Sequence, residues 1–542
     1  MNKKQLEQVH ARLPGLVDDL ESGKMPRRDF LRFSTLLGLS ATSAYAIADA
    51  ITGESLIPAA RAQGTPGGTL RISMNVMELG DPSLADWSQK GNLYRAMLEP
   101  LARVGADNIT RPYLAERWEA NDDLTQWTFH LRQNAMWTNG DPFTAADVVA
   151  NMEKWRTEAH GSSNFSRFSS IESAEVVDDH TVRFNLSSPD IAVPEGLGDY
   201  PALIVHRSFW DEGGNFVDNP VGTGPFVMTD YQVGQRATYA KRDDGGWWGG
   251  EALLDGIEII DHGDDPAAAF SALASGQVDL LYEMSTDQVP AVRNQANLVL
   301  YETITAQTGV ARFHVSTPPY DDARIREAIR SCIDHQALLD LAYQGLGTPG
   351  EDHHVCPVHP EYAEIPRPTQ DYERARALLA EAGYADGIDL EIYCVAQPTW
   401  EPNTVQVIAE MVRPAGINLA VNIMPGGTYW DRWTEWPFGF TSWTHRPLGV
   451  QVLNLAYRTG VPWNEANYSN PEFDALLDEA NGILDVDRRR EVMRDLETIL
   501  QGDSIFIQPY WRAIHTASAD TLQGFELQVA REFDYPVLSL SS

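Results

Sequence analysis

The sequence predicts an α/β fold of two or three lobes. At 542 residues the chain is too long for one hydrophobic core, because single cores stop growing at roughly 250–300 residues. Hydrophobic residues make up 43% of the chain, which is enough to fill the cores of globular lobes. Residues 256–281 follow a strand, helix, strand pattern. This β-α-β order is typical of a mixed sheet with helices packed on it.

Short strands are expected in most of the region before residue 219. Trp118–Ala120 and Trp127–Leu131 alternate apolar and polar side chains, as half-buried strands do. Thr144 and Asp147 have the spacing of a capping box, with Asp in place of Glu, and predict a helix that runs to about Trp155. Further strands are expected at 67–74, 181–186 and 199–205, and a further helix at 91–101.

A sharp bend is predicted at Asn219–Phe226. Its two prolines fix φ near −65° and its two glycines allow positive φ, so the chain changes direction within eight residues. The residues after Phe226 are rich in β-branched and aromatic side chains around a glycine, which predicts a long strand or a hairpin. Considered alone, the stretch could also be an ordinary joint between a loop and a strand.

The second lobe is expected to begin near residue 307 and to end near residue 510. These two passages between the lobes would form a two-strand hinge, which suits closure around a ligand. After the return, Phe525 and Leu527 are expected to finish a sheet of the first lobe. Helices of the second lobe are expected at 322–332, 335–343, 372–382, 404–414, 471–484 and 488–500, and strands at 389–394, 418–423 and 439–442.

Charge and cysteine content exclude several classes of protein. The formal charge is 41 − 77 = −36. Such a surface repels phosphate backbones and anionic lipid, so no nucleic-acid partner is expected. The simplest reason for the charge is an acidic, solvated surface. The three cysteines, Cys332, Cys356 and Cys394, allow at most one disulfide within the chain, and their spacing matches no zinc motif.

The first sixty residues have the features of an export signal. Arg27–Arg28 precedes an apolar pair, as in twin-arginine signals, and the mildly apolar run 33–48 is shorter than the ~20 residues of a spanning helix. Ala60–Ala62 is a small-x-small cleavage site that would leave Gln63 at the mature N-terminus, and Ala44–Ala46 is the alternative. An amphipathic helix or a membrane anchor is the competing interpretation. With no cysteine near the cleavage region, a lipoprotein anchor is not expected, and the mature protein is expected in the periplasm.

Four sequence blocks occur in a characteristic order: Trp137–Val149, Asn219–Phe226, Pro319–Arg330 and Ala377–Tyr384. Together they resemble the extracytoplasmic solute-binding proteins of ABC transporters, in the peptide/nickel-binding family (family 5), over residues 68–526. The resemblance implies the two-lobed periplasmic-binding-protein fold of class II type, with an α+β subdomain inserted in the first lobe. It also implies a monomer that binds a small solute for an ABC permease in the inner membrane, without catalysis and without a cofactor.

The same resemblance implies how the chain is divided. The expected parts are a twin-arginine signal peptide at 1–62, the first lobe at 63–105 and 219–306, the inserted subdomain at 106–218, the second lobe at 307–508, and the return to the first lobe at 509–542. The large cleft of this family admits peptides, opines, metal chelates, haem or aromatic acids. The identity of the ligand therefore stays open.

No catalytic motif stands out in the sequence. It has no P-loop, no Rossmann glycine pattern and no His-Glu-x-x-His, and its serines and cysteines lie in no nucleophile elbow. Abundant acids alone do not indicate a glycosidase pair. A secreted hydrolase and a periplasmic chaperone or sensor partner are the alternative functions. Turnover of a bound compound would reveal the first, and binding to unfolded protein or to a membrane receptor the second.

The main ligand-binding candidates of the second lobe are Trp443, Thr444, His445 and Arg446. In peptide-binding relatives the loop at this position carries an aspartate that pairs with the α-amine of the ligand. Here His445 and Arg446 occupy the loop instead. An arginine fork binds a carboxylate in bidentate geometry, so we expect a ligand with a negative group at this point. The alternative is that Arg446 pairs with a local Asp or Glu.

Two loops of the first lobe should also line the cleft, by the same resemblance. One carries Trp87 and Gln89, and the ring of Trp87 is suited to stacking on an apolar or aromatic group. The other carries Phe165 and Arg167, and Arg167 is a second candidate partner for an anion.

Two further groups of residues are assigned no ligand contact. Tyr429, Trp433 and Trp436 have helical spacing, which predicts a packed face of a helix. The loop 353–359 contains three histidines and a cysteine, which are plausible ligands for a soft metal or for haem. Adjacent histidines point apart in extended chain, however, and relatives use this loop without metal. No metal is therefore assigned to His353, His354, Cys356 and His359, although the question stays open.

Overall fold

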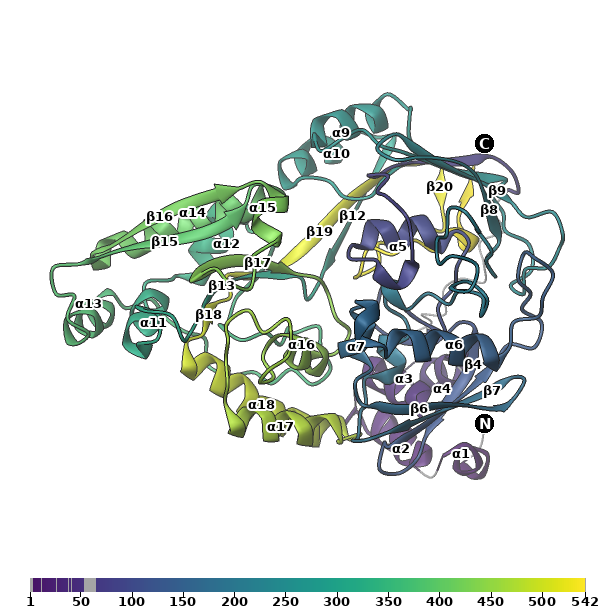
Figure 1. Ribbon diagram of the computed structural model, residues 1–542, viewed down its shortest axis with the longest axis horizontal. Coiled ribbons are helices and arrows are strands. Elements are labelled where there is room, and N and C mark those ends of the chain that lie inside the picture. Colours follow the sequence, from purple (N-terminus) through teal and green to yellow (C-terminus); the bar gives the residue numbers. More distant parts are fainter. Residues whose placement is uncertain are drawn as a thin grey trace. The chain divides into compact units, whose positions relative to one another are not determined.

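The computed structural model describes residues 3–10, 12–25, 27–37, 39, 41–52 and 65–541. They form two compact units (Figure 1): unit 1 comprises Met1–Thr303 and His515–Ser542, and unit 2 comprises Ile304–Ile514. The chain therefore enters unit 2 once and returns to unit 1 once.

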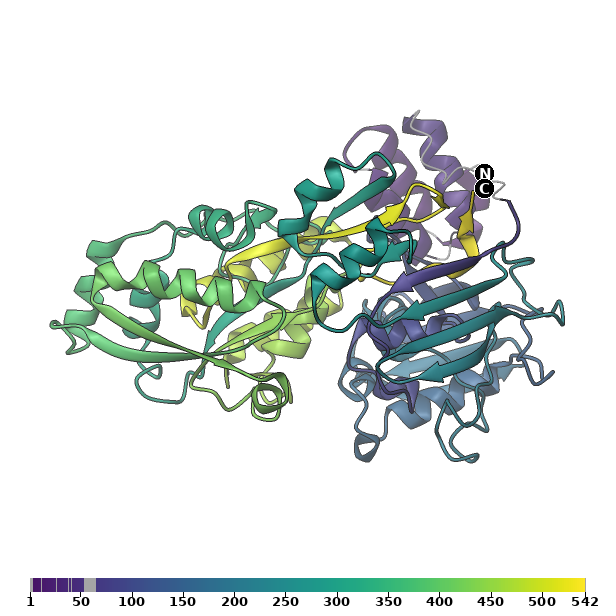
Figure 2. The ribbon, with the colours of Figure 1, turned by 90° about the horizontal axis from the view of Figure 1, so that it is seen from above.

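Unit 1 is built on a mixed sheet with the strand order β12-β19-β11-β1-β10-β9-β8. The first strand, β1, is parallel to both of its neighbours, β10 and β11, whereas β8 and β9 form an antiparallel hairpin at one edge. Figure 2 shows β1, in purple, beside the teal strands of this sheet. The strands are β1 (Thr69–Ser73), β8 (Phe226–Gln232), β9 (Arg236–Lys241), β10 (Gly256–Ile260), β11 (Leu280–Leu281), β12 (Leu298–Ile304) and β19 (Tyr510–Ala519).

The predicted β-α-β unit and hairpin are confirmed. Helix α9 (Pro266–Ala274) connects β10 to β11 and begins at Asp265, whose carboxylate accepts a hydrogen bond from the Ala267 amide. The returning strand is shorter than predicted, because only Leu280–Leu281 pairs with β1. After the bend, β8 and β9 form the expected hairpin.

The bend itself forms for a reason other than the one predicted. Neither Gly222 nor Gly224 has a positive φ. Both are glycines because the Met97 carbonyl lies against them: an added Cβ would come within 2.2 Å of its oxygen at Gly222 and 2.8 Å at Gly224. The Gly224 amide donates to that same carbonyl at 2.7 Å. The requirement is thus close approach of two backbones.

A second, antiparallel sheet of unit 1 has the order β4-β5-β7-β6. Helix α6 (Ala145–Trp155) packs on β6 and β7, and the predicted capping box of Thr144 and Asp147 is present. Apolar side chains of β5 and β7, such as Phe129 and Phe184, are fully buried. The strands are β4 (Ala115–Ala120), β5 (Gln126–Leu131), β6 (Ile171–Asp178) and β7 (Thr181–Leu186).

Three predicted elements of unit 1 are wrong. The helix predicted at 91–101 is found earlier in the chain, as α5 (Ser88–Arg95). It ends before Met97, because the Met97 carbonyl accepts a hydrogen bond from the Gly224 amide instead of one within the helix. No strand forms at 199–205, where Pro201 lacks an amide hydrogen and Asp199 caps a single 3₁₀ turn. Phe525 and Leu527 are buried but follow β20 in irregular chain. The remaining elements are α7 (Asn164–Arg167), α8 (Val193–Gly196), α10 (Val289–Arg293), β2 (Ala102–Val104), β3 (Thr110–Pro112), β20 (Leu522–Gln523) and β21 (Ser539–Leu540).

The described residues of the N-terminal region form four short helices: α1 (Lys3–Val9), α2 (Leu13–Glu21), α3 (Arg27–Leu36) and α4 (Ala41–Thr52). Helix α3 lies near β3 and β4 and buries the side chains of Phe30, Leu31 and Phe33. Arg27 forms an ion pair with Asp49 of α4. The expected cleavage site Ala60–Ala62 and Gln63 lie outside the described residues. Within the described ranges, we find no helix with the length and apolar character needed to cross a lipid bilayer.

Unit 2 contains a mixed sheet with the order β16-β15-β17-β13-β18. Strands β15 and β16 pair in parallel over their whole length, and β17 pairs antiparallel with β13. Its strands are β13 (Thr308–Phe313), β15 (Ile388–Val395), β16 (Ile417–Met424), β17 (Phe438–Trp443) and β18 (Phe506–Ile507), with β14 (Gly347–Pro349) paired to β19.

The helices predicted for the second lobe are confirmed, with ends that shift by a few residues. The largest shift is at α14, which begins at Trp400 rather than at Thr404 and ends at Val412, before Pro414. This helix packs on β15, β16 and β17. The helices of unit 2 are α11 (Ala323–Arg330), α12 (His335–Tyr343), α13 (Tyr372–Glu381), α14 (Trp400–Val412), α15 (Gly426–Trp430), α16 (Gly449–Ala456), α17 (Pro471–Asn481) and α18 (Val486–Asp503).

Candidate functional site

In unit 1, Trp87 and Gln89 lie at the start of helix α5. Trp87 is the N-cap residue and its side chain is 37% exposed, which is unusual for a tryptophan in this protein. Gln89 is half-buried in the first turn. The same helix is anchored by the C-terminal tail: the Asn92 side chain donates to the Arg531 carbonyl at 2.8 Å and accepts from the Phe533 amide at 2.9 Å. An exposed ring thus stands on a firmly held helix end.

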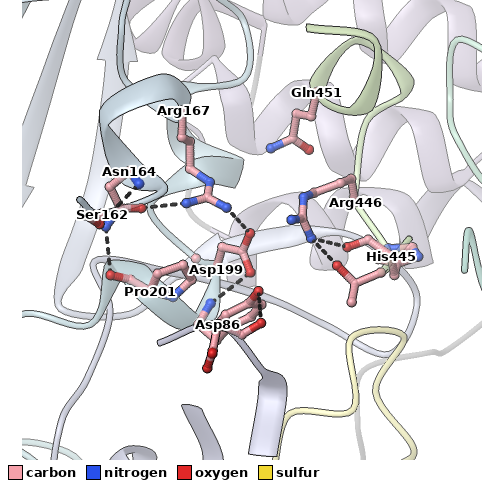
Figure 3. Close-up of polar contacts among 12 residues, drawn as sticks. Asp86, Ser162, Asn164, Arg167, Asp199, Pro201, His445, Arg446 and Gln451 are labelled. Carbon is pink, nitrogen blue, oxygen red and sulfur yellow. Dashed lines mark hydrogen bonds and ion pairs between the residues drawn. The ribbon is translucent and has the colours of Figure 1, made fainter. Parts of the chain in front are cut away.

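Arg167, at the end of α7, pairs with an acid of its own unit. Its Nη2 atom lies 2.8 Å from Asp199 Oδ2, and its Nη1 atom donates to Asn164 Oδ1 at 2.5 Å (Figure 3). The guanidinium is only 6% exposed. A ligand anion would have to share this arginine with Asp199. Phe165 lies on the same short helix and is half-buried.

In unit 2, Trp443 ends strand β17 with its indole committed to a buried acid. Its Nε1 atom donates to Glu465 Oε1 at 3.0 Å. The other oxygen of Glu465 accepts from Arg312 Nε at 2.9 Å and from Thr441 Oγ1 at 2.6 Å. The Trp443 ring also packs edge-on against Trp463, with 5.9 Å between centroids. This network holds the end of β17 in place.

Thr444, His445 and Arg446 follow directly as a loop. Arg446 Nη1 donates to Thr444 Oγ1 at 2.7 Å and to the His445 carbonyl at 3.0 Å (Figure 3). The imidazole Nδ1 of His445 accepts from the Ala306 amide at 3.0 Å. His445 and Arg446 are both buried, and Thr444 is half-buried. Local bonds therefore set the conformation of the guanidinium.

The aromatic series at 429–436 is packed, but the prediction of one helix is wrong. Helix α15 ends at Trp430, so Trp433 and Trp436 lie beyond it. Tyr429 and Trp436 are buried, and Trp436 stacks on Tyr393 with 4.6 Å between ring centroids.

The histidines of the loop 353–359 bind protein groups. His353 Nδ1 accepts from the Val355 amide at 3.3 Å, and His354 Nδ1 lies 2.8 Å from the Tyr457 hydroxyl. Burial lowers the pKa of both His353 and His354 to about 3, so these rings are neutral at physiological pH. Among the residues that the structure describes, no group of three or more His, Cys, Asp and Glu side chains could hold a metal ion.

The three cysteines are free thiols in the interior of the protein. Cys332, Cys356 and Cys394 are all buried thiols without a disulfide. Burial raises the pKa of Cys332 and of Cys394 to about 12, which keeps both of these thiols protonated.

Two groupings were not found from the sequence. Glu351, Glu361 and Glu497 are buried near His353, and burial together with the other two acids raises the pKa of Glu497 well above its usual value. Glu351 and Glu497 are more than a hundred residues apart in the chain, so no local sequence pattern indicates that these acids lie together.

The second grouping contains Asp81, Ser83 and His160. Ser83 Oγ donates to Asp81 Oδ1 at 2.7 Å and lies 2.9 Å from His160 Nε2. Asp81 Oδ2 faces that same Nε2 atom at 3.3 Å. In a catalytic triad the serine and the acid contact opposite nitrogens of the ring, so this arrangement is not a proton relay.

Comparison with known families decides the class of protein. Residues 110–484 match the family described as bacterial extracellular solute-binding proteins, family 5 middle, which is more than half of the chain. The chain belongs to this family.

Several relatives of this family 5 protein have named ligands. The chain is 27% identical over 444 residues to heme-binding protein A of Haemophilus influenzae, covering 75% of this chain and 79% of that protein. It is 24% identical over 477 residues to the glutathione-binding protein GsiB of Salmonella paratyphi A, covering 84% and 91% respectively.

Solved structures show the same fold. The periplasmic binding protein DppA of Helicobacter pylori, in complex with the peptide STSA, matches with a TM-score of 0.78 at 20% identity over 88% of this chain and 99% of that one. The binding protein AgaA of A. tumefacien R10, in complex with agropinic acid, matches with a TM-score of 0.78 at 23% identity over the same shares. The family 5 protein therefore has the mixed α/β, two-lobed fold of periplasmic binding proteins, and it functions as an extracellular solute-binding protein.

Proposed function

We propose that this family 5 protein captures a small carboxylate-bearing solute and delivers it unchanged to an ABC permease. The observation behind the carboxylate is Arg446, which occupies the loop after β17 where peptide-binding relatives are expected to carry an aspartate. A guanidinium matches a carboxylate in bidentate geometry and would repel an amine. The ligands named for relatives and structural neighbours, such as haem, glutathione and agropinic acid, all carry carboxyl groups.

Each lobe contributes contacts in this proposal. Trp87, Gln89, Phe165 and Arg167 would bind from unit 1, and Trp443, Thr444, His445 and Arg446 from unit 2. Binding would shift an equilibrium between open and closed forms, because the closed form contacts the ligand from both lobes and the open form from one. The protein would act as a monomer. Its second lobe would comprise residues 307–508, and the subdomain inserted in the first lobe would comprise residues 106–218.

Native mass spectrometry of freshly purified protein should first identify the co-purified solute. Calorimetric titration of that solute then tests the arginines. Arg446→Ala should weaken binding by about 10- to 100-fold, since a hydrogen-bonded charge is worth about 1.5–3 kcal/mol. Arg446→Lys should recover only part of the loss, because lysine lacks the fork.

Arg167→Ala should lower the affinity only in part, because a ligand anion would have to share Arg167 with Asp199. The matched control is Arg413→Ala, which replaces an exposed arginine directly after α14 and should leave the affinity unchanged. If Arg446→Ala and Arg167→Ala both keep full affinity, the carboxylate preference is wrong. A solute that leaves chemically altered would instead indicate a hydrolase.

We also propose that residues 1–62 direct export by the twin-arginine route, with cleavage near Ala62. The support is the Arg27–Arg28 pair ahead of a short, mildly apolar run. Proteins that use this route cross the membrane already folded.

A further inference from the structure

The loop that carries Arg446 is held from two sides by histidine rings. His445 Nδ1 accepts from the Ala306 amide at 3.0 Å, and His359 Nε2 lies 2.9 Å from the Arg446 carbonyl oxygen. Both rings are 3% exposed, and their centroids are 6.4 Å apart. The backbone on both sides of the loop is therefore fixed by imidazoles rather than by regular secondary structure.

The tautomer of His359 follows from its contacts. Its Nδ1 atom accepts from the Cys356 amide at 3.0 Å. A neutral imidazole has one acceptor nitrogen and one donor nitrogen, so Nε2 carries the hydrogen and donates to the Arg446 carbonyl. The ring thus connects two backbone groups that are 90 residues apart in the chain, at Cys356 and at Arg446.

One of the groups that anchor these rings, the Ala306 amide, lies where the chain passes between units. Ala306 comes two residues after Ile304, where unit 2 begins, and the adjacent Thr305 bonds through its amide and its hydroxyl to the Arg512 carbonyl in β19. Ala306, Cys356 and Trp511 form a small buried cluster. The loop after β17 is therefore tied to both crossing segments.

We propose that His359 and His445 are positioning residues for Arg446, which fix the loop at residues 445–446 and hold it to the crossing segments before a ligand arrives. The His359 ring would do this without touching the ligand, whereas His445 is itself among the proposed contacts. A contact that is held in its bound conformation loses less entropy on binding, so the affinity of the site depends on these two hydrogen bonds. The proposal rests on the proposed function, because it takes Arg446 to be a ligand contact.

Substitution by asparagine or glutamine tests the hydrogen bonds of the two ring nitrogens one at a time. The Asn side-chain amide lies near the position of Nδ1, and the Gln side-chain amide lies near that of Nε2. At residue 359, Gln keeps the donor to the Arg446 carbonyl, whereas Asn keeps only the acceptor for Cys356. At residue 445, Asn keeps the acceptor for Ala306 and Gln does not. The preferred substitution is thus opposite at the two positions, which a general loss of packing would not produce.

Hydrogen–deuterium exchange of residues 441–452 in the ligand-free full chain is the deciding measurement. His359→Asn and His445→Gln should speed exchange of this segment by about 10-fold, since each variant loses one hydrogen bond that holds the loop. His359→Gln and His445→Asn should stay near the wild-type rate. Thermal unfolding of all four variants shows whether any of them is destabilised as a whole.

Affinity is the second readout, measured with hemin, reduced glutathione and agropinic acid as probes. For a probe that the wild type binds, His359→Asn should raise Kd by about 10-fold and His359→Gln should not, because His359 is not among the proposed ligand contacts. The inference is overturned if Asn and Gln give equal exchange rates at either position, or if the order is reversed. If no probe binds the wild type, the carboxylate proposal loses support, while the exchange rates still decide whether these histidines position the loop.

Discussion

At the scale of single residues, a buried acid on α14 couples stability to pH. Glu401 is fully buried, and burial raises its pKa to about 8, although Ser442 and Arg512 act in the opposite direction. In the unfolded chain a glutamate releases its proton near pH 4.3. The native state therefore holds one more proton between about pH 5 and 8, and stability falls as the pH rises through this window.

Glu401→Gln should remove this part of the pH dependence. Glu401 should lower the unfolding free energy of the wild type by about 1.4 kcal/mol for each pH unit between about pH 5 and 8. In the variant, the plot of unfolding free energy against pH should be less steep by that amount. Urea denaturation at several pH values measures the difference. Glu410→Gln, an exposed acid on the same helix, is the control and should follow the wild type. Equal slopes for Glu401→Gln and wild type would contradict the assignment.

Single residues could be proposed as candidates for the site only where a motif gives their place. Trp443 to Arg446 could be singled out because they occupy a defined loop of a recognisable family. The partner of Arg167 could not, because Asp199 lies 32 residues away and no local pattern connects them. Likewise, no spacing in the sequence indicates that His359 bonds to the Arg446 carbonyl, 87 residues on.

At the scale of helices and strands, local chemistry explains most of what was predicted. The capping residues Thr144 and Asp147, the proline after α14 and the alternation in β5 are signals contained within a few residues. The errors occur where distant chain decides the outcome. Helix α5 stops early because the Met97 carbonyl is taken by Gly224, and that contact joins segments more than a hundred residues apart.

Gly222→Ala tests this contact between backbones. An alanine Cβ would lie 2.2 Å from the Met97 oxygen, so the two segments must move apart, at a cost of about 1–3 kcal/mol of unfolding free energy. Gly502→Ala, in helix α18, is the control because an added Cβ meets nothing within 4 Å. It should leave stability unchanged or raise it by up to ~1 kcal/mol. Chemical denaturation of both variants measures the effect, and equal midpoints would refute this explanation of the bend.

At the scale of the whole molecule, the order of four sequence blocks was more informative than any one of them. Each block is short, but together they imply the family that the match over residues 110–484 establishes. The division into two units follows from length and from the two crossings of the chain. The identity of the ligand could not be inferred from the sequence, because ligand specificity depends on a few side chains rather than on the fold.

Export can be tested with the first 62 residues fused to a reporter protein. Replacing both Arg27 and Arg28 by lysine should abolish export, because the twin-arginine pathway reads the arginine pair. Arg32→Lys, a nearby arginine outside the pair, should leave export intact. Fractionation of the periplasm and the cytoplasm measures the outcome, and unchanged export of the double variant would exclude this route.

The anchoring of α5 by the C-terminal tail bears on the order of events during synthesis. Asn92 binds the backbone at Phe533, 441 residues later, and β11 pairs with β19 only after the chain has passed through all of unit 2. The anchoring of the helix that presents Trp87 therefore cannot be completed until the segment around Phe533 has been synthesised. A nascent chain released before that point would lack this anchor for α5, although the tryptophan itself was synthesised more than four hundred residues earlier.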